Sequence, residues 1–108
     1  MNGLHRKSLQ IVVEDTDRWD DQALYEAIVR LLARRGVAGA TVWSGLMGYG
    51  ASMHIHRKGL FGIADEKPVV IMAIDTEEAI RSVLPEVLEM IQEGIVVLQD
   101  AEVFVKHP

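Results

Sequence analysis

The 108-residue chain contains no cysteine, and only 6% of its residues are aromatic. The absence of cysteine excludes disulfides, thiolate catalysis, and zinc or iron–sulfur sites that use cysteine ligands. No apolar run reaches the roughly 20 residues of a membrane span or the roughly 7 to 15 of a signal-peptide core. We therefore expect no membrane insertion and a cytoplasmic location. The length leaves room for one domain, so residues 1–108 are treated as a single unit.

The chain also lacks a net positive charge, because 16 acidic residues outnumber 11 Lys and Arg residues and give a formal net charge of −5. Nucleic acids and anionic membranes attract proteins through a basic field, so this charge argues against a nucleic-acid-binding role. What the chain does have is aliphatic content: 49% of the residues are hydrophobic, and the mean hydropathy is +0.14. A short chain buries a small fraction of its surface, so this excess predicts that another chain covers part of it.

Hydrophobic periodicity predicts four strands and two helices in the order βαββαβ. The first three strands are expected at residues 9–13, at 40–47 with a glycine interrupting the strand, and at 69–74. Residues 95–106 are expected to form a fourth strand, or two short strands separated by a turn at Gln99 and Asp100.

The first predicted helix carries a single apolar stripe at helical spacing. The stripe consists of Leu24, Ala27, Ile28, Leu31 and Leu32. Asp20 or Asp21 is the expected N-cap, and Gly36 is the expected C-terminal stop. The preceding acidic residues could bind a hard cation, but we interpret them as a solvated turn that complements the positive N-terminus of this helix. These residues are Glu14, Asp15, Asp17, Asp20 and Asp21.

The second predicted helix carries a longer stripe. The stripe consists of Ile80, Val83, Leu84, Val87, Leu88 and Ile91. Asp75 and Glu78 are the expected N-cap and N3 residues, and Gly94 is the expected end of the helix. Pro85 lies inside the stripe, and because proline removes a backbone hydrogen bond we expect the helix to bend there.

Right-handed crossovers close this order into an α+β, ferredoxin-like sandwich, in which a four-stranded antiparallel sheet carries both helices on one face. Strand 69–74 is apolar on both faces, so the face without helices needs a partner. Burying ~300 Å² of such a face contributes about 7 kcal/mol, at about 25 cal/mol per Å². The sequence therefore predicts an obligate homo-oligomer built on the open face of the sheet.

Residues 48–67 form a predicted loop of about twenty residues, longer than the ~12 to 15 that compact domains usually contain, and such loops are often functional. Its glycines let backbone amides approach an anion, and its basic side chains suit a phosphate-bearing ligand. The candidate phosphate contacts are His54, His56, Arg57 and Lys58. His54 and His56 would share a face in an extended segment and could ligate zinc or copper, but we interpret them as solvated loop residues and assign no metal ligand.

Catalytic patterns do not stand out in the chain. We find no Ser/His/Asp order and no paired carboxylates typical of glycosidases, so we predict that the protein is not an enzyme and assign no catalytic residue. Trp19 and Trp43 are interpreted as packing residues, with a role as ligand platforms as the alternative.

The segment GVAGATVWSGLMGYG, residues 36–50, resembles a segment of nitrogen-regulatory PII proteins that reads roughly GITGMTVTEVKGFG. The chain as a whole is similar to a family of small uncharacterised PII-like proteins, from residue 8 to residue 106. Further motifs of that family are LYEAIV at 24–29, GYGAS at 48–52, EKPVVI at 66–71 and EGIV at 93–96.

This resemblance implies a ferredoxin-like subunit in a homotrimer, with residues 48–67 acting like the T-loop of PII, which contacts effector proteins. It implies an adenine nucleotide (AMP, ADP or ATP) bound in clefts between subunits, and a protein or membrane-transporter partner. Thr41 matches the PII threonine that helps hold adenine, and Gly48 and Gly50 match the glycines before the T-loop, with Tyr49 in the aromatic place. The implied ligand-binding set is Thr41, Gly48, Tyr49, Gly50, Ala51 and Ser52, acting chiefly through backbone groups.

The chain departs from PII at its phosphate contacts. The Gly-Asp-Gly-Lys loop of PII has no counterpart, since QEGIVV at 92–97 keeps only Gly94. AMP or ADP therefore fits better than ATP with Mg²⁺. The resemblance favours a non-enzymatic signalling protein. The alternatives are a metal-responsive trimer resembling divalent-cation-tolerance proteins, with His54 and His56 as ligands, and a plain oligomeric scaffold.

Overall fold

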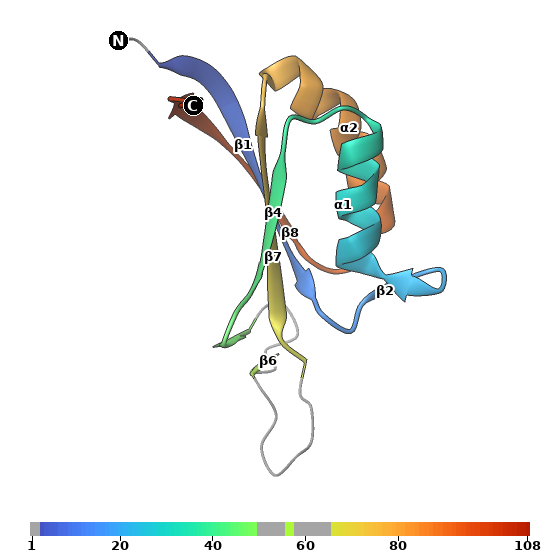
Figure 1. Ribbon diagram of the computed structural model, residues 1–108. Helices are drawn as coiled ribbons and strands as arrows, with labels where there is room; N and C mark the ends of the chain where they lie inside the picture. Colours follow the sequence, from blue (N-terminus) through green and yellow to red (C-terminus); the bar gives the residue numbers. More distant parts are fainter. Residues whose placement is uncertain (1–2, 50–55, 58–65) are drawn as a thin grey trace.

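The computed structural model describes residues 3–49, 56–57 and 66–108 (Figure 1). Its main sheet has four antiparallel strands in the order β4-β7-β1-β8, and both helices lie on one face of it. The strands are β1 (Leu4–Glu14), β4 (Ala40–Ser44), β7 (Pro68–Asp75) and β8 (Ile95–Val103), and the helices are α1 (Leu24–Arg34) and α2 (Glu77–Met90). The predicted α+β, ferredoxin-like sandwich is confirmed.

Strand β1 is longer than predicted, because β8 pairs with it from Leu4 to Val12. The same pairing makes β8 one continuous strand. Gln99 lies opposite Ser8 and Asp100 opposite Lys7, so the alternative of a turn at these two residues is wrong. Because β1 continues alongside Gln99 and Asp100, their backbone stays hydrogen-bonded in the sheet despite the turn propensity of these residues.

Two short strand pairs flank the main sheet. Strand β2 (Arg18–Trp19) pairs with β3 (Gln22–Ala23), and β5 (Met47–Gly48) pairs with β6 (His56–Arg57). The predicted strand 40–47 is therefore two strands, and the break falls at Gly45. The Gly45 amide donates to the Pro68 carbonyl oxygen at 2.7 Å, and a Cβ at Gly45 would lie 2.7 Å from Pro68 Cγ. Only glycine allows this approach.

Helix α1 begins differently from the prediction. Its N-cap is Ala23, which makes no side-chain cap hydrogen bond, while Asp20 takes a φ of 55° in the turn between β2 and β3. The hairpin thus uses the aspartates that were expected to cap the helix. Gly36 is confirmed as the stop: its φ is 77°, and its amide donates to the Ala33 carbonyl oxygen.

Helix α2 is capped by Thr76, one residue later than predicted. Thr76 Oγ1 accepts from the Ala79 amide at 3.1 Å. Asp75 is engaged elsewhere, because its carboxylate accepts from the Ala38 amide at 2.9 Å and from the Thr76 amide at 2.7 Å. The helix runs through Pro85 and ends at Met90 rather than at Gly94.

Beyond α2, Gly94 makes room for the neighbouring strand instead of ending the helix. A Cβ at Gly94 would lie 2.7 Å from the Val12 carbonyl oxygen. On the helix itself, Leu88 was predicted to face the core, but half of its surface is exposed (50%). Leu88 was therefore wrongly included in the apolar stripe of this helix.

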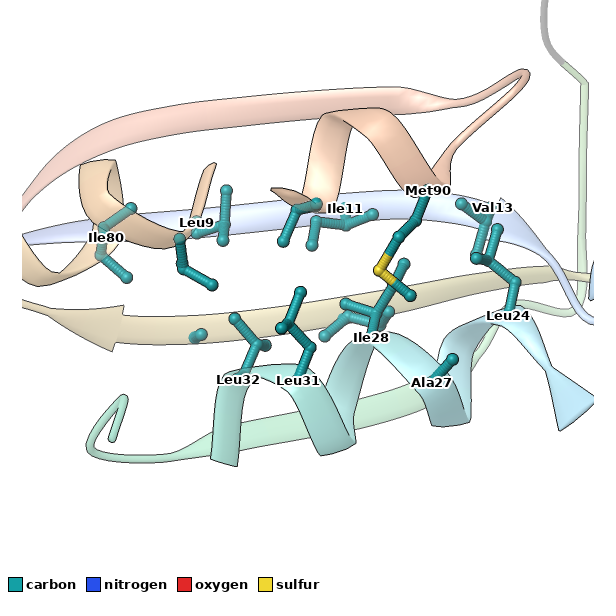
Figure 2. Close-up of a cluster of buried hydrophobic side chains, with 14 residues drawn as sticks. Leu9, Ile11, Val13, Leu24, Ala27, Ile28, Leu31, Leu32, Ile80 and Met90 are labelled. Carbon is teal, nitrogen blue, oxygen red and sulfur yellow. The ribbon is translucent and has the colours of Figure 1, made fainter. Parts of the chain in front are cut away.

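The hydrophobic core lies between the helices and one face of the sheet (Figure 2). Its members are Leu9, Ile11, Val13, Leu24, Ala27, Ile28, Leu31, Leu32, Ile71, Ala73, Ile80, Val83, Val87 and Met90. The core residues of β1 and β7 are alternate residues, as expected where one face of a strand is buried. Both predicted helix stripes supply the other side.

The residues between these core positions lie on the open face. Trp43 pairs with Val70, Val70 with Val12, and Val12 with Ile95, so one row across all four strands is apolar. In the described part of the chain no helix is both long enough and apolar enough to cross a membrane.

Candidate functional site

Thr41 lies on β4, the strand at one edge of the sheet. It pairs with Met72 of β7, whose neighbours Ile71 and Ala73 point into the core, so Thr41 lies on the open face. All five residues of β4 are exposed. The residue to which the resemblance assigns adenine contact is therefore accessible at the rim of the uncovered face.

Gly48 and Tyr49 follow at the end of β5. Gly48 pairs with His56 and Met47 with Arg57, which brings the backbone of these two basic positions beside the candidate glycine. The expectation that 48–67 lacks strand structure is wrong at this point. A strand of two residues is too short to show an alternating pattern, so sequence periodicity could not reveal it.

Half of the predicted ligand set is placed by the structure. Thr41, Gly48 and Tyr49 are described, and β6 fixes the backbone of His56 and Arg57. The remaining predicted site residues, Gly50, Ala51, Ser52, His54 and Lys58, lie outside the described residues. Their assignment stays a prediction.

The described site is apolar and exposed. Large hydrophobic side chains with exposed surface follow one another from β4 to the end of β5. They are Val42 (36%), Trp43 (45%), Leu46 (84%), Met47 (57%) and Tyr49 (68%). Ligand sites combine such surfaces with a few polar groups, and the Thr41 hydroxyl and nearby backbone amides are polar groups beside this apolar stretch. Trp43, for which the sequence left a role as a ligand platform as the alternative, lies two residues after Thr41, and this spacing places both on one face of the strand.

The acidic residues after β1 have a structural role. Asp15 Oδ1 accepts from the Lys67 amide at 3.1 Å, and Asp17 Oδ2 accepts from the Glu14 amide at 3.0 Å. These contacts fix the entrance to β7 next to Pro68. Among the described residues, no group of three His, Asp or Glu side chains is arranged to hold a metal ion.

The charged side chains with shifted pKa values lie at the other end of the sheet. Lys7 Nζ donates to Asp100 Oδ1 at 2.5 Å, and this hydrogen bond lowers the pKa of Asp100. The hydrogen bond from Arg81 lowers the pKa of Glu77, and the charge of Lys7 adds to the effect. In the sheet Lys7 lies opposite Asp75 and Trp43 lies opposite Val70, so four residues of β7 (71–74) separate the position of Lys7 from that of Trp43.

The family model that matches residues 6–103 carries the description "Uncharacterized ACR, COG1993". The chain belongs to this DUF190 family. A UPF0166 protein, MJ1524 from Methanocaldococcus jannaschii, is 33% identical over 99 residues, which cover 91% of each chain. A UPF0166 protein from Aquifex aeolicus is 31% identical over 103 residues, covering 95% of this chain and 97% of the relative.

Solved structures confirm the resemblance to PII-like proteins. CPII from Thiomonas intermedia K12, a nitrogen regulatory PII-like protein bound to ADP, AMP and bicarbonate, is 25% identical with a TM-score of 0.64. The match covers 93% of the DUF190 chain and 89% of CPII. The divalent ion tolerance protein CutA1 from Ehrlichia chaffeensis has a TM-score of 0.61 at 13% identity, over 94% and 83% of the two chains. The CutA1 likeness shows a shared fold alone, so a metal role for His54 and His56 stays an alternative.

Proposed function

We propose that this DUF190 chain is a non-enzymatic, PII-like regulatory protein that binds an adenine nucleotide. The observation that carries the proposal is the position of Thr41, which is exposed on the edge strand β4 and continuous with the exposed apolar stretch that leads to Gly48 and Tyr49. CPII, which shares the fold at 25% identity, binds ADP and AMP, and this supports the same ligand class here.

The assembly that we propose is a homotrimer formed through the open face of the sheet. The apolar residues Val70, Val12 and Ile95, which follow Trp43 across the open face, give copies of the chain a surface to cover. Strand β4 lies at the rim of that face, so the ligand residues would line the clefts between subunits. Light scattering of the purified chain tests the assembly: a trimer mass is expected, and a monomer mass at micromolar concentration contradicts it.

Calorimetry tests the ligand. AMP and ADP should release heat and raise the melting temperature, while GMP and GDP should bind more weakly, because a guanine ring presents different edge groups. Thr41→Val should weaken binding by roughly threefold to tenfold, as expected for loss of one hydrogen bond. Ser82→Ala removes a hydroxyl from α2, outside the proposed site, and should leave binding unchanged. If neither ATP, ADP nor AMP gives heat or a thermal shift, the nucleotide proposal is wrong.

The regulatory part of the proposal is that nucleotide binding changes how residues 48–67 are presented to a protein or transporter partner. A ligand shifts such an equilibrium only by its differential affinity for the two states. Because Gly48 pairs with His56, contacts made at Gly48 bear directly on β6. Trypsin cleavage after Arg57 and Lys58 should therefore slow when AMP or ADP is added. Equal cleavage rates with and without nucleotide would favour the plain scaffold instead.

A further inference from the structure

The indole of Trp43 lies in an unusual place for a packing residue. It is 45% exposed, on an edge strand, and its partner Val70 belongs to the open face rather than to the core. Trp43 and Thr41 are two residues apart on β4, so their side chains rise from the same face about 6.6 Å from each other. Trp43 therefore does not belong to the hydrophobic core of the described chain.

The polar groups of these two residues are available. Within residues 3–49, 56–57 and 66–108, no hydrogen bond involves the Thr41 hydroxyl or the Trp43 indole Nε1. A hydroxyl both donates and accepts, and an indole N–H donates. The pair thus presents a flat apolar face with a donor on the ring and a donor and acceptor beside it.

We propose that Trp43 is the platform on which the base of the bound nucleotide stacks, next to Thr41. A flat heteroaromatic ring gains stacking energy on an indole face, and polar groups along its edge can meet the Thr41 hydroxyl. Only the base can stack on the indole, because the sugar and phosphate have no flat aromatic ring. The phosphate would instead contact backbone amides near Gly48. The inference rests on the proposed function and names the residue that holds the ring.

Trp19 provides an internal control. It is also exposed (38%), but it lies on β2, in a hairpin next to Asp17, Asp20 and Asp21. Three carboxylates repel a nucleotide phosphate, so this second indole should not bind the ligand. The chain has only these two tryptophans, and each can be made the sole fluorophore by replacing the other.

Fluorescence then locates the base. In Trp19→Phe, titration with AMP or ADP should quench the emission of Trp43 in proportion to saturation. In Trp43→Phe, the emission of Trp19 should stay constant. Emission of Trp43 that does not change while calorimetry reports binding overturns the inference and leaves the proposed function standing. Absence of binding to the unmodified protein overturns both.

Affinity separates stacking from a structural role. Trp43→Ala should weaken AMP binding by about tenfold, as loss of one base–aromatic stack does, while Trp43→Phe should lose less and Trp19→Ala nothing. Ribose 5-phosphate, which lacks a base, should bind equally to the unmodified protein and to Trp43→Ala. Circular dichroism and light scattering are run on each variant. If Trp43→Ala loses affinity only together with its assembly mass, Trp43 is a subunit contact and the inference is wrong.

Discussion

Strand β7 presents the same kind of side chain to both faces of the sheet, yet the two faces have different surroundings. Val69, Ile71 and Ala73 are 4%, 0% and 1% exposed beneath the helices, whereas their neighbours on the open face are only half-buried. Those neighbours are Val70, Met72 and Ile74. Side-chain chemistry therefore does not decide which face is covered; the stripes of α1 and α2 do.

The difference between the faces separates folding from association. The helix-covered face supplies the core on which the fold of one chain depends. The open face of β7 is just as aliphatic, but its residues do not belong to the hydrophobic core of the described chain. Water-exposed aliphatic rows of this kind mark surfaces for another protein. Substitutions on the two faces should consequently fail in different ways.

The largest effect is expected for Ile71→Asp. Ile71 is fully buried between α1, α2 and the sheet, and a carboxylate there has no cationic partner. An unpaired buried charge costs about 4 kcal/mol or more, comparable with the total stability of a small domain. Circular dichroism should show a largely unfolded chain. A cooperative melting transition close to that of the unmodified protein would show that this face does not carry the fold.

Met72→Asp introduces the same carboxylate at the neighbouring residue of β7. It should disrupt the assembly and leave the fold of the single chain intact. Met72 lies on the open face, where a charge stays in water in the separate chain but would be buried between copies. The variant should keep its circular dichroism spectrum and scatter light as a monomer. Leu88→Asp is the matched control, since Leu88 is half exposed on the outer side of α2 and should keep the assembly mass. Equal masses for all three proteins would contradict association through the open face.

The order of elements, the sheet and most of the core followed from the sequence, because apolar periodicity is strong in α1, α2 and β7. The misplaced features have tertiary causes. Asp20 was expected to cap α1, but the β2–β3 hairpin takes it into a turn. Asp75 was expected to cap α2, but the Ala38 amide, 37 residues away in the chain, engages its carboxylate. The residues around a helix start do not reveal a hydrogen-bond partner that far away in the chain.

The candidate site was less predictable than the fold. A family resemblance, rather than any periodicity, pointed to Thr41, Gly48 and Tyr49. The pairing of β5 with β6 and the exposure of Trp43 depend on strand register, which alternation alone leaves undetermined for an edge strand apolar on both sides. The two-residue spacing places Trp43 and Thr41 on one face of β4, and the register in the structure makes this the open face.

A smaller effect is expected for Thr76→Ala, which weakens the N-terminus of α2, one of the two helices that cover the sheet. Thr76 Oγ1 accepts from the Ala79 amide, and loss of such a cap lowers the free energy of unfolding by about 1 kcal/mol. Urea denaturation should show a lower midpoint with an unchanged slope. Thr76→Ser keeps the cap oxygen and should recover most of the loss. The assembly mass should not change, since α2 lies away from the open face.

The smallest effect is expected at the rim of the helix-covered face, where Lys7 pairs with Asp100. The hydrogen bond from Lys7 lowers the pKa of Asp100 below its ordinary value of 3.8, so its stabilising contribution is present above that pH and is lost as the pH falls through the lowered value. Asp100→Asn should thus melt slightly earlier than the unmodified protein at pH 7, and the difference should vanish in strong acid. Glu102→Gln makes the same charge change on β8, where no ion pair with Glu102 is found within the described residues. A pH-independent difference for Asp100→Asn, or an equal one for Glu102→Gln, would mean that the Lys7 pair does not stabilise this rim.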